Sequence, residues 1–246
     1  MEMESILLCV TQISTYVEQS CLTNATGFFF QRDEKLFLAT SKHVFVDEKS
    51  SHFPDRVVIK FHTDKNNATR AIDFSIPLYV RGKSQWVSGT DKTGDIDVAV
   101  IQIFRERLPS DVIFEAFGPQ NLLAQEDTVE IGTPLLIVGF PLGFYDTLHN
   151  LPVARSAINA SSFALRFQGN GYFLTDARTH RGSSGAPVVC RDNTGRSLTL
   201  PWILLGIHSG RLDITGRDSE LDEALGLNCA WFSDILLTLT KARDEA

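Results

Sequence analysis

The segment TDARTHRGSSGAPV, residues 175–188, places Ser184 between two glycines, ahead of an apolar run that begins at Ala186. Glycine and serine are common in turns, so this segment alone fits either a nucleophilic serine or a plain small-residue turn. A nucleophilic serine needs an imidazole that takes its proton and a carboxylate that orients the imidazole. The rest of the sequence therefore decides between the two interpretations.

Composition limits the kind of protein and its partners. The chain has 246 residues, 43% of them hydrophobic, which is enough for one large domain or two small barrels. Its net charge of -7 leaves no basic surplus to neutralise a phosphate backbone, which argues against nucleic acid as the main partner. The first ten residues contain no lysine or arginine, and their apolar run is too short for a signal peptide or a membrane span. We therefore expect a cytoplasmic protein without membrane contact.

Cysteine usage argues against a metal centre and a disulfide framework. The four cysteines show neither paired metal-ligand spacing nor the density of a disulfide scaffold: Cys9, Cys21, Cys190 and Cys229. We expect free thiols, no metal and no cofactor.

Short runs rich in β-branched and aromatic residues alternate with polar turns along the chain, a pattern typical of antiparallel β proteins. A stretch rich in proline, glycine and charge, residues 105–127, separates two such series. We predict an all-β fold of two antiparallel β-barrels, residues 1–118 and residues 119–246, with a short helix in the C-terminal tail. The clearest predicted strands are SILLCVTQI (5–13), KLFLATS (35–41), IDVAVIQIF (96–104), PLLIVGF (134–140) and LPWILLGIHSG (200–210).

Two residues of the first half are candidate partners for Ser184. His43 follows an apolar strand and a small-residue turn, so we expect it at the rim of the first barrel; a structural histidine is the alternative there. Asp97 precedes an almost wholly apolar run, where a carboxylate needs a hydrogen-bonded partner such as an imidazole. Asp95 is the competing carboxylate, and both acids could simply flank the strand. We favour Asp97 because it has apolar neighbours.

The order His43, Asp97, Ser184 is that of the trypsin-like, chymotrypsin-fold serine proteases, which this chain resembles over most of its length. The segment around Ser184 is similar to the bacterial HtrA-like branch. This resemblance implies a double barrel and serine endopeptidase activity. The motifs that carry it are ATSKHV (39–44), DVAV (97–100), VGFPLG (138–143) and GSSGAP (182–187).

The resemblance also implies a role for each site residue. Ser184 would attack the scissile carbonyl, His43 would act as base and then acid, and Asp97 would orient His43. The backbone N–H groups of Gly182 and Ser184 would form the oxyanion hole. Ser183 stands where animal zymogens carry an aspartate, and the bracing cysteines of those enzymes are absent, which favours a bacterial, intracellular enzyme without activation by N-terminal cleavage.

The expected substrate is a protein or peptide, and specificity in this fold comes from the pocket beside the nucleophile. Thr179 and His208 match the positions at which glutamyl endopeptidases contact an acidic P1 side chain, and Ser209 and Gly210 complete the expected pocket. Both Thr179 and His208 can donate hydrogen bonds to a carboxylate or an amide oxygen. We therefore expect glutamate at P1, with glutamine second. Purely structural roles for Thr179 and His208 are the alternative.

Three other interpretations use the same residues. A gated or inactive protease-like module would bind a peptide or a regulatory partner protein in the cleft. An esterase would use the same triad with another leaving group. An α/β-hydrolase is disfavoured because its triad runs serine, acid, histidine, whereas here the histidine comes first and a strand follows the serine.

Overall fold

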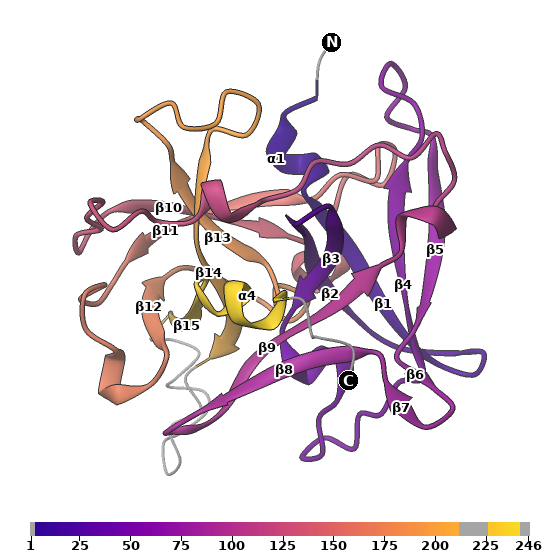
Figure 1. Ribbon diagram of the computed structural model, residues 1–246, viewed down its shortest axis with the longest axis horizontal. Coiled ribbons are helices and arrows are strands. Elements are labelled where there is room, and N and C mark those ends of the chain that lie inside the picture. Colours follow the sequence, from indigo (N-terminus) through magenta and orange to yellow (C-terminus); the bar gives the residue numbers. More distant parts are fainter. Residues whose placement is uncertain (1–2, 212–225, 242–246) are drawn as a thin grey trace.

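The computed structural model describes residues 3–211 and 226–241 of the chain. The described chain is built mainly of β-strands in two groups that lie side by side (Figure 1). The earlier part of the chain, indigo to magenta in the figure, forms one group, and the later part, in orange and yellow, forms most of the other. The predicted all-β, two-barrel fold class is confirmed.

The first group is a seven-stranded antiparallel sheet with the order β5-β4-β1-β2-β3-β9-β8. Its long β9 pairs with β3, so that Thr40 lies opposite Ala99 and the end of β3 comes close to Asp97. Its strands, with the separate small β6–β7 hairpin, are β1 (Val10–Val17), β2 (Ser20–Arg32), β3 (Lys35–Thr40), β4 (Arg56–His62), β5 (Ala71–Pro77), β6 (Tyr79–Val80), β7 (Lys83–Ser84), β8 (Trp86–Asp91) and β9 (Gly94–Ile103).

The second group is a closed six-stranded barrel with the order β10-β11-β12-β15-β14-β13. The proposed domain boundary, between residues 118 and 119, falls in the connection between β9 and β10. The barrel strands are β10 (Pro134–Gly139), β11 (Val153–Asn159), β12 (Tyr172–Asp176), β13 (Pro187–Arg191), β14 (Trp202–Arg211) and β15 (Leu227–Phe232).

The helices are short. The expected C-terminal helix is α4 (Ile235–Leu239), and Leu236 and Leu239 bury its apolar face. The strand predicted from Ser5 is wrong at its start, because residues 5–8 form a helical turn and β1 begins only at Val10. That turn places Ile6 and Cys9, three residues apart, in the same buried cluster. The remaining helical segments are α1 (Ser5–Leu8), α2 (Lys42–Phe45), η1 (Arg105–Arg107), η2 (Pro119–Asn121), η3 (Pro141–Gly143) and η4 (Phe167–Gly169).

Three apolar clusters hold the fold together. One lies within the first sheet and one within the second barrel. The third contains residues of both groups, among them Phe28 and Phe30 from β2, Phe140 from the second half and Trp231 from β15. Burial of this shared apolar surface packs the two groups directly against each other, and the site described below lies at the same junction.

Thr26 on β2 is a polar link across this junction. Its buried hydroxyl donates to the carbonyl of Gly182 at 2.7 Å and accepts from the Phe140 N–H at 3.0 Å. Its backbone N–H donates to the Ser184 carbonyl at 3.0 Å, and its carbonyl accepts from the Thr40 hydroxyl at 2.8 Å. One residue therefore connects the strand before His43 with the loop that carries Ser184.

Replacing Thr26 with valine tests this link. Valine keeps the volume but leaves a buried carbonyl and a buried N–H without partners, so we expect Thr26→Val to lower the free energy of unfolding by about 2 kcal/mol or more. Urea denaturation measures the change. The matched control is Thr23→Val at an exposed position of the same strand, which should stay within about 0.5 kcal/mol of wild type. Equal stabilities for the two variants would contradict the assigned role of Thr26.

Candidate active site

His43 and Asp97 form a two-point contact. His43 lies in α2, directly after β3, and its Nδ1 lies 2.7 Å from Asp97 Oδ2. The backbone N–H of His43 donates to the other carboxylate oxygen, Oδ1, at 2.9 Å. These two contacts hold both the ring and the backbone of the histidine. Because a carboxylate only accepts, they set the tautomer with the proton on Nδ1 and leave Nε2 unprotonated.

A third donor reaches Asp97 from the second barrel. The Ser209 hydroxyl on β14 donates to Asp97 Oδ2. Ser209 was expected only as a residue of the substrate pocket, and no local motif indicated this contact, which arises from the packing of the two groups of strands. The competing carboxylate, Asp95, instead accepts from Lys42 Nζ at 2.6 Å. Of the two acids, Asp97 is thus the one that contacts His43.

Two opposing effects set the pKa of His43. Burial by itself lowers this pKa, since it disfavours the charged ring. The hydrogen bond and the negative charge of Asp97, with a further contribution from Asp47, outweigh burial, and the pKa is raised above 6.5. A raised pKa means that the site stabilises the imidazolium.

Ser184 lies in the loop between β12 and β13, and two contacts bring this loop to the His43 segment. The carbonyl of His208 accepts from the Gly185 N–H at 2.7 Å and from the Ser41 hydroxyl at 3.1 Å. Gly185 follows Ser184, and Ser41 precedes His43 by two residues. Within the described residues no hydrogen bond joins the Ser184 hydroxyl to the His43 ring; such bonds are often long in unliganded enzymes.

Gly185 shows how tightly this loop is packed. Its φ is +83°, and a Cβ there would lie 2.1 Å from Thr40 Oγ1 and 2.2 Å from the Thr26 carbonyl oxygen. Only glycine allows this backbone conformation and this close approach. Residue 185 must therefore be glycine if Ser184 is to lie beside the end of β3.

Gly182 shapes the turn before Ser184. Its φ is +92°, and a Cβ there would lie 2.5 Å from the Phe140 carbonyl oxygen. The carbonyl of Arg181 accepts from the Leu142 N–H, so the N–H of Gly182, on the far side of the same trans peptide, points away from η3. Among the described residues, neither the Gly182 N–H nor the Ser184 N–H has an acceptor. The loop therefore presents two free backbone donors around Ser184.

Three of the expected pocket residues lie on β14, and the fourth, Thr179, lies in the loop before Ser184. His208 is 1% exposed, and its Nδ1 has no hydrogen-bond partner. Burial, and then the charge of His43, lower the pKa of His208 to about 4, so its ring is neutral at pH 7. Thr179 is half-buried, and its hydroxyl donates to Asn228, a residue that the sequence analysis did not identify. Gly210 follows a bulge in β14, with φ of +105°.

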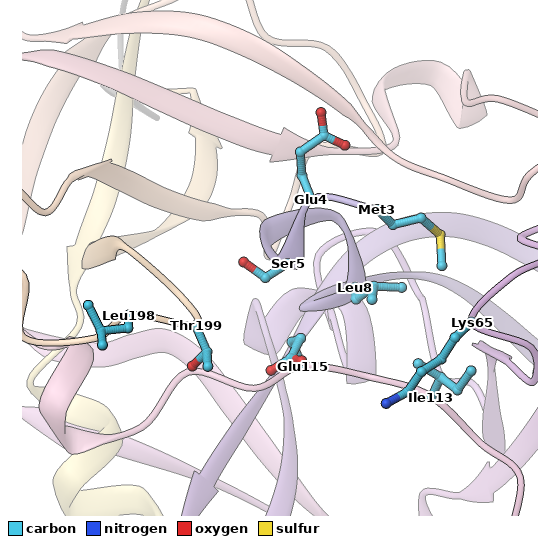
Figure 2. A pocket seen from close by; sticks show the side chains of 9 residues that line it. All are labelled: Met3, Glu4, Ser5, Leu8, Lys65, Ile113, Glu115, Leu198 and Thr199. Carbon is cyan, nitrogen blue, oxygen red and sulfur yellow. The ribbon is translucent and has the colours of Figure 1, made fainter. Parts of the chain in front are cut away.

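A separate cavity of about 570 Å³ lies beside α1 (Figure 2). Figure 2 shows Lys65 and Ile113 on one side of this cavity and Leu198 and Thr199 on the other. None of its lining residues belongs to the cluster around His43. The volume of this cavity therefore does not identify the active site. The assignment of the site rests on the contacts between His43 and Asp97 and on the position of the Ser184 loop.

Two further findings concern the described residues. Residues 3–211 and 226–241 contain no helix that is long and apolar enough to cross a membrane. Over the same ranges, no three histidine, cysteine or acidic side chains gather in an arrangement that could hold a metal ion.

Comparison with known proteins assigns the family. The family model described as "Trypsin-like peptidase domain" matches residues 25–197, which include His43, Asp97 and Ser184. The chain belongs to the trypsin-like peptidase domain family. This membership assigns the chain to a family of peptidase domains. No curated protein sequence matches the chain.

Solved structures agree with the trypsin-like peptidase fold. A serine endoprotease from Yersinia pestis is 18% identical, with a TM-score of 0.57, and the match covers 95% of this chain and 62% of that protein. The chain thus spans less than two thirds of the length of that endoprotease. The Rv3671c protease from M. tuberculosis, in its active form, is 15% identical, with a TM-score of 0.53 and coverage of 98% of this chain and 84% of that one. Its inactive form matches at 15% identity and a TM-score of 0.53, covering 95% and 88% of the two chains.

The His43–Asp97 contact in this trypsin-like peptidase predicts how the histidine titrates. In wild type, NMR of ¹³C-labelled histidine should give a pKa above 6.5 for His43. Asp97→Asn removes the negative charge that raises the pKa of His43. Burial of the ring, which lowers this pKa, remains, so the pKa should fall. Asp95→Asn is the matched control and should leave it unchanged. An equal pKa in the two variants would contradict the assignment of Asp97 as the partner of His43.

Proposed function

We propose that this trypsin-like peptidase is a serine endopeptidase in which Ser184, His43 and Asp97 form the catalytic triad. The observation that carries the proposal is the two-point contact of His43 with Asp97, which fixes the ring with Nε2 unprotonated. The links through the His208 carbonyl bring the Ser184 loop to the same place. A serine beside such a ring has a base for its proton.

In the proposed reaction His43 Nε2 accepts the Ser184 hydroxyl proton as the oxygen attacks the scissile carbonyl. The tetrahedral intermediate then collapses, the C–N bond breaks, and His43 gives its proton to the leaving amine. Water, activated by His43, hydrolyses the acyl-enzyme and regenerates the serine. Asp97 accepts from three donors, and its negative charge stabilises the imidazolium that forms on His43.

The oxyanion hole is proposed to consist of the Gly182 and Ser184 N–H groups. Both lack an acceptor among the described residues, and the Arg181 carbonyl is held away by Leu142. Donors that are fixed before the reaction stabilise the developing negative charge without reorganisation, and losing one typically costs about 10²–10³ in rate. The geometry of Gly182 thus serves catalysis as well as packing.

For specificity we propose a P1 pocket formed by Thr179, His208, Ser209 and Gly210 that takes glutamate or glutamine. Thr179 and His208 would supply the polar groups that contact the substrate: the Thr179 hydroxyl donates to Asn228 and keeps its lone pairs, whereas the Ser209 hydroxyl is directed to Asp97. These four residues include polar groups but no aspartate or glutamate that would pair with a cation, so the pocket suits a short acidic or amide side chain better than a cationic or large apolar one.

The cellular setting is also a proposal. Four unpaired cysteines fit a reducing compartment, so we propose a cytoplasmic enzyme, and the HtrA-like motifs favour a bacterial one. The substrate would be a protein or peptide, with no nucleic acid or membrane involved.

One observation supports a gated form of the same enzyme as the second candidate. The Ser184 hydroxyl and the His43 ring make no hydrogen bond to each other in the described chain. A substrate or a regulatory partner protein would then complete the triad on binding, as loop closure does in other enzymes.

Labelling with a fluorophosphonate tests the triad, because this reagent reacts with serines that a base and an oxyanion hole activate. We expect intact-mass analysis to show one adduct per chain in wild type and none in Ser184→Ala. Ser183→Ala is the matched control and should keep the adduct. Labelling that persists in Ser184→Ala would overturn the assignment of the nucleophile. Absence of labelling in folded wild type, restored by a protein substrate, would favour the gated form.

A peptide library varied at P1 tests the pocket. Cleavage after glutamate and glutamine should exceed cleavage after lysine, arginine or phenylalanine by about tenfold or more, because a polar pocket without a countercharge excludes cations and large apolar groups. Liquid chromatography with mass spectrometry of the products locates each cut. A preference for lysine, arginine or phenylalanine would exclude this pocket assignment.

A further inference from the structure

Asn228 on β15 has a fully determined hydrogen-bond pattern. Its side chain is buried, with 3% of the residue exposed. Its Nδ2 donates to the Ala177 carbonyl at 2.8 Å and to the Gly226 carbonyl at 2.9 Å. Rotating the amide would place Oδ1 against two carbonyl oxygens that can only accept. The oxygen of Asn228 must therefore face its third partner, the hydroxyl of Thr179.

This pattern determines the direction of the Thr179 hydrogen bond. A hydroxyl has one proton, and Thr179 uses it on Asn228 Oδ1. The remaining capacity of Thr179 Oγ1 consists of lone pairs, so toward a substrate it is an acceptor. From the sequence, Thr179 was expected to donate a hydrogen bond to the substrate. Because its proton is used on Asn228, Thr179 accepts from the substrate instead.

The strand register places His208 on the same face of the barrel wall as Asn228. Ala230 lies opposite His208 across β14 and β15, and Ala230 and Asn228, two residues apart, point to the same side of β15. The Nδ1 of His208 is buried without a partner. A proton there would lack an acceptor, which favours the neutral ring with its proton on Nε2. His208 thus offers the pocket one donor and no positive charge, in agreement with its lowered pKa.

We propose that Asn228 is a positioning residue that fixes Thr179 as an acceptor, so that the pocket selects the neutral amide of glutamine over the carboxylate of glutamate at P1. One donor from His208 matches the amide oxygen of glutamine, and one acceptor at Thr179 matches its amide N–H. A carboxylate has only acceptors and would leave Thr179 Oγ1 facing another oxygen. This inference rests on the proposed endopeptidase function and on the proposed P1 pocket.

The test compares kcat/KM for two peptides that are identical except for glutamine or glutamate at P1. For wild type at pH 7 we expect the glutamine peptide to be cleaved at least about tenfold more efficiently, the cost of one mismatched hydrogen bond. Thr179→Val removes the acceptor and should bring the ratio close to one. Thr179→Ser keeps the hydroxyl and should keep the ratio.

Asn228→Ala tests the positioning role, because it frees the Thr179 hydroxyl to rotate and donate. Its ratio should shift toward glutamate. The matched control is Asn121→Ala: Asn121 is also buried, and its amide donates to the carbonyls of Leu200 and Trp202. That variant should keep the wild-type ratio even if it lowers stability, since the ratio does not depend on the amount of folded enzyme.

Each outcome of this experiment is decisive. A wild-type enzyme that cleaves after glutamate as well as or better than after glutamine overturns the inference, while cleavage itself leaves the endopeptidase function standing. A glutamine preference that survives Thr179→Val or Asn228→Ala also overturns it. If neither peptide is cleaved although fluorophosphonate labels Ser184, the pocket assignment fails and the inference with it. If there is neither cleavage nor labelling, the proposed function itself fails.

Discussion

The carboxylate of Asp97 is the group on which the site depends. A half-buried negative charge is costly unless several donors surround it, and Asp97 has three. Two of them come from His43 in the first group of strands, and the third comes from Ser209 on the second barrel. The requirement to satisfy this carboxylate therefore sets the position of the histidine ring and keeps β14 close to it.

The backbone conformation of the loop around Ser184 determines the rest of the site. Gly182 and Gly185 flank the serine pair, and each has a positive φ and a neighbour too close for a Cβ. Thr26 binds the carbonyls of this loop region from β2, on the opposite group of strands. The loop is thus held by contacts that side chains of ordinary size would prevent, and this constraint leaves the backbone donors around Ser184 free.

The pocket illustrates how a buried polar group acquires a definite role. Asn228 satisfies two carbonyls of its own barrel, and this requirement leaves its oxygen for Thr179. Burial keeps His208 neutral. The hydrogen-bonding character of the pocket follows from these interior requirements, and the residue types at positions 179 and 208 alone do not determine it.

The sequence by itself determined the β-rich fold class and indicated His43, Asp97 and Ser184 as candidate residues. These predictions rest on local patterns: strand periodicity, turn residues and short motifs in a particular order. The start of the first strand was predicted wrongly, because the burial of Ile6 and Cys9 in the core between the barrels overrides the local β-propensity.

Only the tertiary structure decided which carboxylate meets His43, that Ser209 binds Asp97, that Thr26 bridges the junction and that Thr179 donates to Asn228. Each of these contacts joins residues far apart in the chain, and the contact of His43 with Asp97 in place of Asp95 also depends on how β3 and β9 pair. The physical reason is the same in every case: hydrogen-bond direction and the satisfaction of buried charge depend on which groups the packing of two barrels brings within about 3 Å of one another.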